Sequence, residues 1–280
     1  MQELVYLNGW VGSFDNAHIS INDRGYNFGD GIYEVVRTYD GKMFAVDDHL
    51  KRLETSAAVL EIGLPWDKKQ LNAIISDLLE QSEIREAIIY IQITRGTAHR
   101  NHLYDPDIRP NLLVTIRSTP DIPQSTYIQG VNIISCPEFR WQMCHVKSTS
   151  LAAAVMAKNK AHRAGAAEAV FVMDDGTVTE CTSSNIFIYK GGTLMTHPAN
   201  NRILAGITRK HILNLAEGMG MHIRPEPFKF EDMIAADEVF LTGSISEVIP
   251  VVDIDGQTIA GGKPGPITGK LHQAFISLRS

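Results

Sequence analysis

The sequence lacks the features of membrane, secreted and nucleic-acid-binding proteins. No apolar stretch is long enough to cross a bilayer, and the first residues carry neither the basic nor the apolar region of a secretory signal. Lysine and arginine number 26 against 32 acidic residues, so the formal net charge is −6 and no basic footprint for nucleic acid or an anionic membrane is expected. We also find no internal repeat and no low-complexity tract. A globular protein with neither kind of partner is predicted.

Cysteine is scarce, and its number, three, is odd. Cys136, Cys144 and Cys181 are widely spaced, which favours free thiols in a reducing compartment over a disulfide framework. The cytoplasm is therefore the expected location. The spacing of His99 and His102 could suggest a metal site, but an arginine lies between them and no carboxylate or cysteine cluster accompanies them. We expect no metal site.

A chain of 280 residues can bury a large core and form one or two domains. A short connector with two prolines and polar neighbours, residues 119–125, divides the chain. We therefore expect one domain in residues 1–118 and a second in residues 126–280.

Hydrophobic periodicity and turn residues predict the elements of the first domain. Asp40-Gly41 separates two strand-like segments, residues 33–39 and 42–46, and is a strong hairpin signal. Asp47 and Asp48 are placed to cap a following helix. A second helix and two further strands, residues 87–94 and 111–117, complete this domain.

Strands and helices alternate in the second domain. The predicted strands are residues 127–135, 169–173, 185–189, 239–242 and 248–254. The predicted helices are residues 151–164, 206–218, 230–235 and 269–278. This pattern indicates a mixed, mainly antiparallel α+β arrangement rather than a doubly wound parallel sheet.

Two charged residues, each followed by a hydroxyl-rich stretch, suggest a chemistry. Lys147 precedes Ser-Thr-Ser and the small residues of 151–154, which would let a bulky group lie close to the backbone. A lysine amine can form a Schiff base with an aldehyde. Glu180 opens the run Cys-Thr-Ser-Ser-Asn, and a carboxylate that keeps a pyridine nitrogen protonated makes pyridoxal phosphate an electron sink. Taken alone, each residue is more simply interpreted as a solvated surface group.

Six blocks in one order strengthen this interpretation. They are residues 23–34 (DRGYNFGDGIYE), 90–96 (YIQITRG), 146–148 (VKS), 179–185 (TECTSSN), 204–209 (LAGITR) and 237–244 (DEVFLTGS). In order and separation the series resembles the fold-type IV pyridoxal-phosphate enzymes, most of all the D-amino acid aminotransferases, from Asn8 to about Gln273. The resemblance implies an α+β, two-domain architecture with a small α/β N-terminal domain and a larger mixed-sheet C-terminal domain.

The resemblance also implies pyridoxal 5'-phosphate as cofactor. Lys147 would be the Schiff-base lysine and general base, and Glu180 the partner of the pyridinium nitrogen. The phosphate needs donors, and the predicted helix that opens at residues 206–208 offers free N–H groups and a favourable dipole. The full set of expected cofactor contacts is Arg52, Lys147, Glu180, Ser184, Leu204, Gly206, Ile207, Thr208, Gly243 and Ser244.

A substrate carboxylate requires a clamp of donors. Arg100 and His102 form an Arg-x-His pair that matches the D-amino acid aminotransferase pattern, and Tyr33 supplies a further donor. Val35 is expected to shape the side-chain pocket. In the family this loop reaches the active site of the neighbouring subunit, so the resemblance implies a homodimer in which Arg100 and His102 act in trans.

The leading hypothesis is transamination between D-amino acids such as D-alanine and 2-oxo acids such as 2-oxoglutarate. Two alternatives share the fold: aminodeoxychorismate lyase, whose pattern does not call for the Arg-x-His clamp, and branched-chain L-amino acid aminotransferase, whose first-domain motifs differ more. A non-catalytic vitamin B6 carrier would need phosphate contacts but no carboxylate for the ring nitrogen. Intact Lys147 and Glu180 therefore argue against a carrier.

Overall fold

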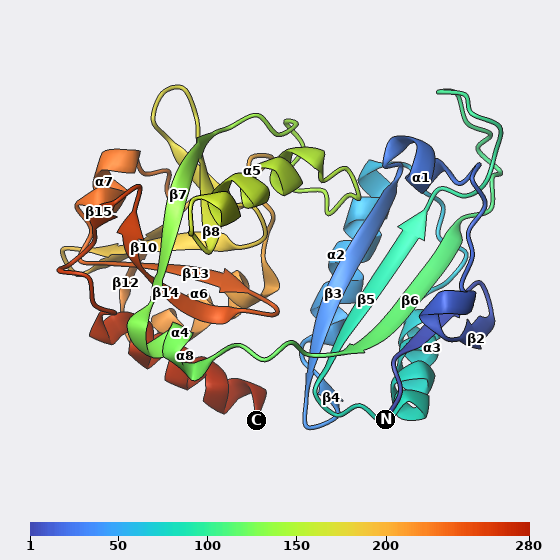
Figure 1. Ribbon diagram of the computed structural model, residues 1–280, viewed down its shortest axis with the longest axis horizontal. Helices are drawn as coiled ribbons and strands as arrows, with labels where there is room; N and C mark the ends of the chain where they lie inside the picture. The colour runs from blue at the N-terminus through green and yellow to red at the C-terminus, as the bar shows by residue number, and fades with distance from the viewer. The chain divides into compact units, whose positions relative to one another are not determined.

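The computed structural model describes residues 1–280 and divides into two compact units, each considered separately (Figure 1). The first unit comprises Met1–Pro120 and Val146–Leu151, and the second comprises Asp121–His145 and Ala152–Ser280. The short segment with Lys147 therefore packs in the first unit, although it follows the connector in sequence. The functional domain boundaries stay a prediction.

The first unit is built on a six-stranded antiparallel sheet in the order β2-β1-β6-β5-β3-β4. Its strands are β1 (Leu4–Leu7), β2 (Trp10–Gly12), β3 (Gly31–Tyr39), β4 (Lys42–Met43), β5 (Ala87–Thr94) and β6 (Asn111–Ser118). A 3₁₀ turn, η1 (Phe14–Asn16), and the short helix α1 (Arg24–Phe28) precede β3.

Two helices, α2 (Val46–Val59) and α3 (Lys68–Ser82), pack on this sheet (Figure 1). Helix α2 lies against β3, and α3 lies against β1 and β6, so their buried leucines and isoleucines, at helical spacing, face the buried side of the sheet. The core includes Leu50, Leu53, Leu71, Ile75, Ile89 and Ile91, all fully buried.

The hairpin expected at Asp40-Gly41 is confirmed: both residues have positive φ (51° and 80°), and Tyr39 pairs with Lys42. Two left-handed residues match the twist of the flanking strands. The predicted capping of α2 is wrong. Ala45, in a left-handed conformation, takes the N-cap position without a side-chain cap, and Asp47 and Asp48 lie in the first turn. There they still interact favourably with the helix dipole.

The second unit contains a nine-stranded mixed sheet in the order β12-β11-β10-β13-β14-β7-β8-β9, with β15 pairing to β14. The strands are β7 (Val131–Pro137), β8 (Glu168–Val172), β9 (Val178–Cys181), β10 (Asn185–Lys190), β11 (Thr193–Thr196), β12 (His222–Arg224), β13 (Glu238–Gly243), β14 (Glu247–Ile254) and β15 (Gln257–Thr258). The pairs β11–β12, β14–β7 and β7–β8 are parallel and the others antiparallel, as the α+β prediction requires.

Five helices belong to this unit: α4 (Gln124–Gln129), α5 (Ala152–Arg163), α6 (Ile207–Gly218), α7 (Phe230–Ile234) and α8 (Pro266–Arg279). Helix α5 lies along β7 and β8, whereas α6 and α8 contact each other and β13 (Figure 1). The core between sheet and helix α7 joins Val170, Ile186, Val239 and Met233. No helix of the chain is both long and apolar enough to span a bilayer.

The strand predicted for residues 127–135 is partly wrong. Residues 124–129 form α4, and β7 begins only at Val131. Pro123 at the N-cap and the left-handed Gly130 (φ 77°) delimit this short helix. Local turn chemistry therefore overrides the apolar pattern of the first four residues.

Candidate functional site

Lys147 is held in the first unit by its backbone rather than by a helix. Its carbonyl accepts a hydrogen bond from the Tyr33 N–H (2.9 Å), and its N–H donates to Ser56 Oγ (3.1 Å). A bridge between Ile32 and Ser148 extends this pairing along β3. The Nζ atom lies 4.3 Å from the centroid of the Tyr33 ring. The amine is therefore presented by a fixed backbone, over one face of an aromatic ring.

Tyr33 and Val35 alternate with core residues along β3, so their side chains share the sheet face opposite the core. The Tyr33 ring stacks on Tyr90, with centroids 5.6 Å apart, and Tyr90 donates its hydroxyl to Gln92 Oε1 (2.6 Å). Burial raises the pKa of Tyr90 to about 12. The structure thus brings Lys147 to Tyr33, and Val35 lies two residues further along the same face of β3.

Glu34, on the opposite face of β3, is fully buried and anchors a charged network. Arg52 donates from Nε and Nη2 to its two carboxylate oxygens, at 2.7 and 2.8 Å, and His49 Nδ1 lies 2.7 Å from Oε2. Burial, the largest single effect, would raise the pKa of Glu34, but the charge and hydrogen bonds of Arg52 together with His49 outweigh it and lower that pKa to about 2. Burial lowers the pKa of His49. The guanidinium of Arg52 is therefore oriented in advance.

Sequence reasoning missed Glu34 and His49, although signals for both were present. Glu34 falls on the same strand face as the core residues Ile32 and Val36, where an unpaired carboxylate would be costly. His49 and Arg52 are three residues apart in one helix and so share a face.

The loop with Arg100 and His102 is irregular, and both residues are exposed. Arg24 of α1 is buried and holds the loop by its backbone: Nη1 donates to the Asn101 carbonyl (2.6 Å) and Nη2 to the His102 carbonyl (3.3 Å). The Arg100 guanidinium lies 5.1 Å from the Phe28 ring centroid, and the His102 ring lies 5.5 Å from the same ring. The sequence block that begins at Asp23 therefore positions the Arg-x-His loop.

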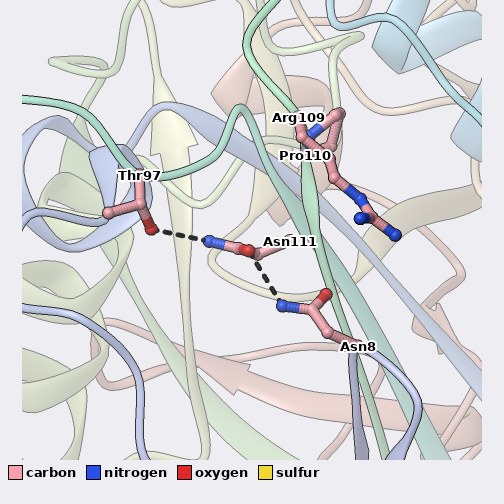
Figure 2. A pocket seen from close by; sticks show the side chains of 5 residues that line it. All are labelled: Asn8, Thr97, Arg109, Pro110 and Asn111. Carbon is pink, nitrogen blue, oxygen red and sulfur yellow. Dashed lines mark hydrogen bonds between the residues drawn. The ribbon is translucent and has the colours of Figure 1, made fainter.

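A pocket of about 320 Å³ lies at the base of this loop. Figure 2 shows the side chains that line it. Thr97 and Arg109, at the two ends of the loop, line it, and Asn111 donates to Thr97 Oγ1 (3.1 Å). Asn8 donates to Asn111 Oδ1 (2.9 Å). A Cβ on Gly96 would lie 2.1 Å from the Arg109 carbonyl oxygen. The two ends of the loop are therefore closely packed against each other.

Glu180, on β9 of the second unit, is buried among donors. Arg140 donates from Nη1 to Oε1 (2.6 Å), and Asn185 Nδ2 donates to Oε2 (2.9 Å). The Leu204 N–H lies 3.2 and 3.1 Å from the two oxygens. Such a carboxylate is stabilised in its charged form.

Arg140 is a partner of Glu180 that the sequence did not reveal. Its guanidinium also donates to Glu138, from Nε at 2.9 Å and Nη2 at 2.6 Å, and it lies 4.4 Å from the Phe171 ring centroid. Burial opposes its charge, but the two carboxylates outweigh burial and raise the pKa of Arg140. The pKa of Glu138 is lowered, because Arg140 outweighs the effect of burial. Arg140 thus fixes the orientation of Glu180.

A second carboxylate organises the hydroxyl-rich stretch after Glu180. Glu168 is buried and accepts hydrogen bonds from the hydroxyls of Thr182, Ser183 (2.9 Å) and Ser184 (3.4 Å). The loop that carries Ser184 is therefore tied to Glu168 by three hydroxyl groups.

The residues expected to bind phosphate lie at the start of α6 and the end of β13. Gly206 is the N-cap of α6 and supplies no capping side chain, so the first N–H groups of α6, from Ile207 and Thr208, have no side-chain cap. A Cβ on Gly206 would lie 2.0 Å from Asn185 Oδ1. Thr242, beside Gly243, is 2% exposed, and its Oγ1 has no hydrogen-bond partner. An uncapped helix start and an unpaired buried hydroxyl fit an anionic group.

Comparison with known proteins places this geometry among related chains. The family model for amino-transferase class IV matches residues 31–254. The chain is 42% identical to a D-alanine aminotransferase of Listeria monocytogenes serotype 4b over 97% of this chain and 94% of that protein. It is 40% identical to a D-alanine aminotransferase of Bacillus licheniformis over 97% and 95%.

Solved structures show the same fold. The branched-chain amino acid aminotransferase of Escherichia coli superposes with a TM-score of 0.93 at 23% identity, covering 100% of this chain and 95% of that one. Another branched-chain amino acid aminotransferase, solved with pyridoxamine 5'-phosphate, gives a TM-score of 0.91 at 24% identity, covering 99% and 95%. At these identities the likeness concerns the fold alone.

Proposed function

We propose, from the premise that the chain belongs to the amino-transferase class IV family, that it transfers amino groups between D-amino acids such as D-alanine and 2-oxo acids such as 2-oxoglutarate. The observation that carries the proposal is the agreement with proteins named D-alanine aminotransferase, about 40% identical over nearly the whole chain. The branched-chain enzymes share the fold at 23–24% identity. The three free cysteines agree with a cytoplasmic protein.

We propose pyridoxal 5'-phosphate as the cofactor. Bound, it would supply an aldehyde for a lysine amine and a ring that withdraws electrons from the substrate α-carbon. Residues of the chain fit each of its parts. Lys147 Nζ would hold the aldehyde, Glu180 the ring nitrogen, and the start of α6 the phosphate, together with Gly243, Ser244 and the oriented Arg52. By family resemblance Leu204 packs on the ring and Ser184 lies nearby.

Lys147 has two tasks in this proposal. Its amine would anchor the cofactor and, when free, would carry the proton of the substrate α-carbon to the cofactor carbon C4′. Backbone hydrogen bonds to Tyr33 and Ser56 restrict where Nζ can reach. A fixed base costs little reorganisation during proton transfer.

Glu180 would keep the ring nitrogen protonated. Arg140, Asn185 and the Leu204 N–H hold its carboxylate, so the charge is in place before the reaction begins. Preorganised charge of this kind is effective because it needs no rearrangement in the transition state.

We expect the purified protein to transfer the amino group of D-alanine to 2-oxoglutarate. We predict turnover of D-alanine at least about 100-fold above that of L-alanine or L-leucine, since a misplaced carboxylate leaves the clamp donors unpaired. Absorbance of the cofactor during single half-reactions with each amino acid gives the measurement. Preference for L-leucine would favour the branched-chain reaction, and pyruvate release from aminodeoxychorismate would favour the lyase.

We further propose a homodimer in which Arg100 and His102 bind the substrate carboxylate, with Tyr33 and Val35, in the partner's site. The loop and its neighbours expose apolar side chains that a partner would cover: Leu103 is 81% exposed, Ile21 79% and Tyr26 72%. An arginine at a solvated surface would bind a carboxylate weakly, whereas one partly desolvated by a partner would bind strongly.

Mixing two inactive variants, Lys147→Ala and Arg100→Ala, tests action in trans. Random subunit exchange should make about half of the dimers mixed, each with one intact site, so activity should approach about one quarter of the wild-type value. Mass spectrometry of differently tagged subunits monitors the exchange. If exchange is complete and activity stays absent, the clamp acts within one chain.

A further inference from the structure

The hairpin that joins β13 to β14 contains an unusual residue. Gly243 pairs with Glu247, which leaves Ser244, Ile245 and Ser246 as a three-residue loop. Glu247 has φ = 56°, in the left-handed region. Hairpin connections commonly place glycine at a left-handed position, because a side chain in this conformation is strained. A buried glutamate is retained in such a strained conformation only where its surroundings hold it there, which is common at functional sites.

The Glu247 carboxylate joins the hairpin to the C-terminal helix. It is 2% exposed, and its Oε2 lies 3.1 Å from Nε2 of His272. Oε1 lies 3.1 Å from Nε of Arg279. Both partners belong to α8, so one carboxylate fixes the start of β14 against two turns of that helix.

Helix α4 reaches the same loop from another direction. The Tyr127 ring stacks on His272, with centroids 4.5 Å apart and planes 21° from parallel. The Tyr127 hydroxyl donates to the Ser246 carbonyl, at 3.5 Å. Inside the loop there is little free space: a Cβ on Gly243 would lie 2.8 Å from Ser246 Oγ. The backbone from Gly243 to Glu247 is therefore held at both ends.

We infer that Glu247 is a positioning residue for the cofactor phosphate: its contacts with His272 and Arg279 of α8 fix the Gly243–Ser244 backbone. The inference rests on the proposed function, because it assigns phosphate to this loop. The unpartnered Thr242 hydroxyl, directly before Gly243, agrees with an anion at this end of β13. Without the Glu247 carboxylate the loop keeps its sequence but loses the contacts that orient its N–H groups.

The variant Glu247→Gly distinguishes a role of the Glu247 carboxylate from a role of its left-handed backbone conformation. Glycine relieves the left-handed strain, so a purely conformational role predicts equal or higher stability and unchanged cofactor binding. We expect instead that the dissociation constant for pyridoxal phosphate rises roughly 10-fold, the loss typical of hydrogen bonds to a charged group. Ala260→Gly is the matched control, since Ala260 also has a left-handed φ (48°) and carries no polar side chain. Its affinity should stay at the wild-type value.

Pyridoxal lacks the phosphate, so its affinity should not depend on a phosphate site. General structural damage would weaken the binding of pyridoxal as well as that of pyridoxal phosphate. Absorbance titrations of apoprotein with pyridoxal phosphate and with pyridoxal should show that Glu247→Gly weakens only the former. Equal weakening of both ligands, or of neither, would overturn the inference. Arg279→Gln should give the same pattern in a variant whose hairpin is intact, which covers the case in which Glu247→Gly does not fold. A wild-type protein that binds no pyridoxal phosphate would overturn the proposed function as well.

Discussion

Replacement of Lys147 by alanine is expected to reduce turnover of D-alanine by about 10⁴-fold, the upper range for loss of a positioned acid–base group. The same substitution removes the attachment point of the cofactor. Borohydride reduction of the wild-type protein should therefore attach the cofactor irreversibly to the peptide that contains Lys147. Mass spectrometry after proteolysis identifies the labelled lysine.

Lys158→Ala is the matched control for this prediction. Lys158 Nζ donates to the Ala167 carbonyl (2.6 Å) and lies 3.5 Å from Glu168 Oε1. Its amine therefore already has partners within the protein. We expect near wild-type turnover in this variant. A label on Lys158 or Lys160 would transfer the anchoring role to helix α5 and contradict the assignment of Lys147.

Local signals in the sequence were sufficient for most elements of the fold. The Asp40-Gly41 turn, the apolar face of α2 and the alternating residues of β5 are each specified within a few residues. Errors arose where two local signals competed, as at residues 124–129. There Pro123 and Gly130 delimit a short helix in what otherwise resembles the start of a strand.

The chemical groups of the site were predicted in type, but their supporting partners were not. Arg140 and Glu180 are 40 residues apart, and Arg140 lies in an irregular segment with no periodicity. Their contact exists only because β9 and that segment are brought together by the fold. Arg52 illustrates the same limit: its charge was evident from the sequence, whereas its bidentate pairing with Glu34 depends on packing of α2 against β3.

Glu180→Gln is expected to slow the half-reaction with D-alanine by roughly 10²–10³-fold, the cost of removing one preorganised electrostatic partner. Affinity for pyridoxal phosphate should fall much less, because the phosphate contacts are unchanged. The substitution keeps the size of the side chain but removes the charge that supports a protonated ring nitrogen. Stopped-flow absorbance of the cofactor gives the rate, and equilibrium titration gives the affinity.

The geometry around Glu180 makes this substitution more severe than a simple loss of charge. Arg140, Asn185 and the Leu204 N–H all donate to its oxygens, and each oxygen accepts from at least one of them. The NH2 group of a glutamine at position 180 would therefore face one of these donors, and neither group could accept a hydrogen bond from the other. Asn185 cannot reverse its own amide freely, since Nδ2 also donates to the Leu204 carbonyl (2.9 Å). Some loss of order at Leu204 should accompany the loss of rate.

The variant Glu138→Gln distinguishes the loss of the Glu180 charge from the disturbance of the hydrogen bonds around it. Glu138 also pairs with Arg140, at 2.6 Å from Nη2, so its substitution disturbs the same guanidinium while leaving the Glu180 charge in place. We expect lower thermal stability but a half-reaction within about 10-fold of the wild-type rate, because the group proposed to face the ring is retained. Comparable slowing in both variants would mean that Arg140, rather than the Glu180 charge, governs the rate. A full-rate half-reaction in Glu180→Gln would mean that the ring nitrogen has a different partner.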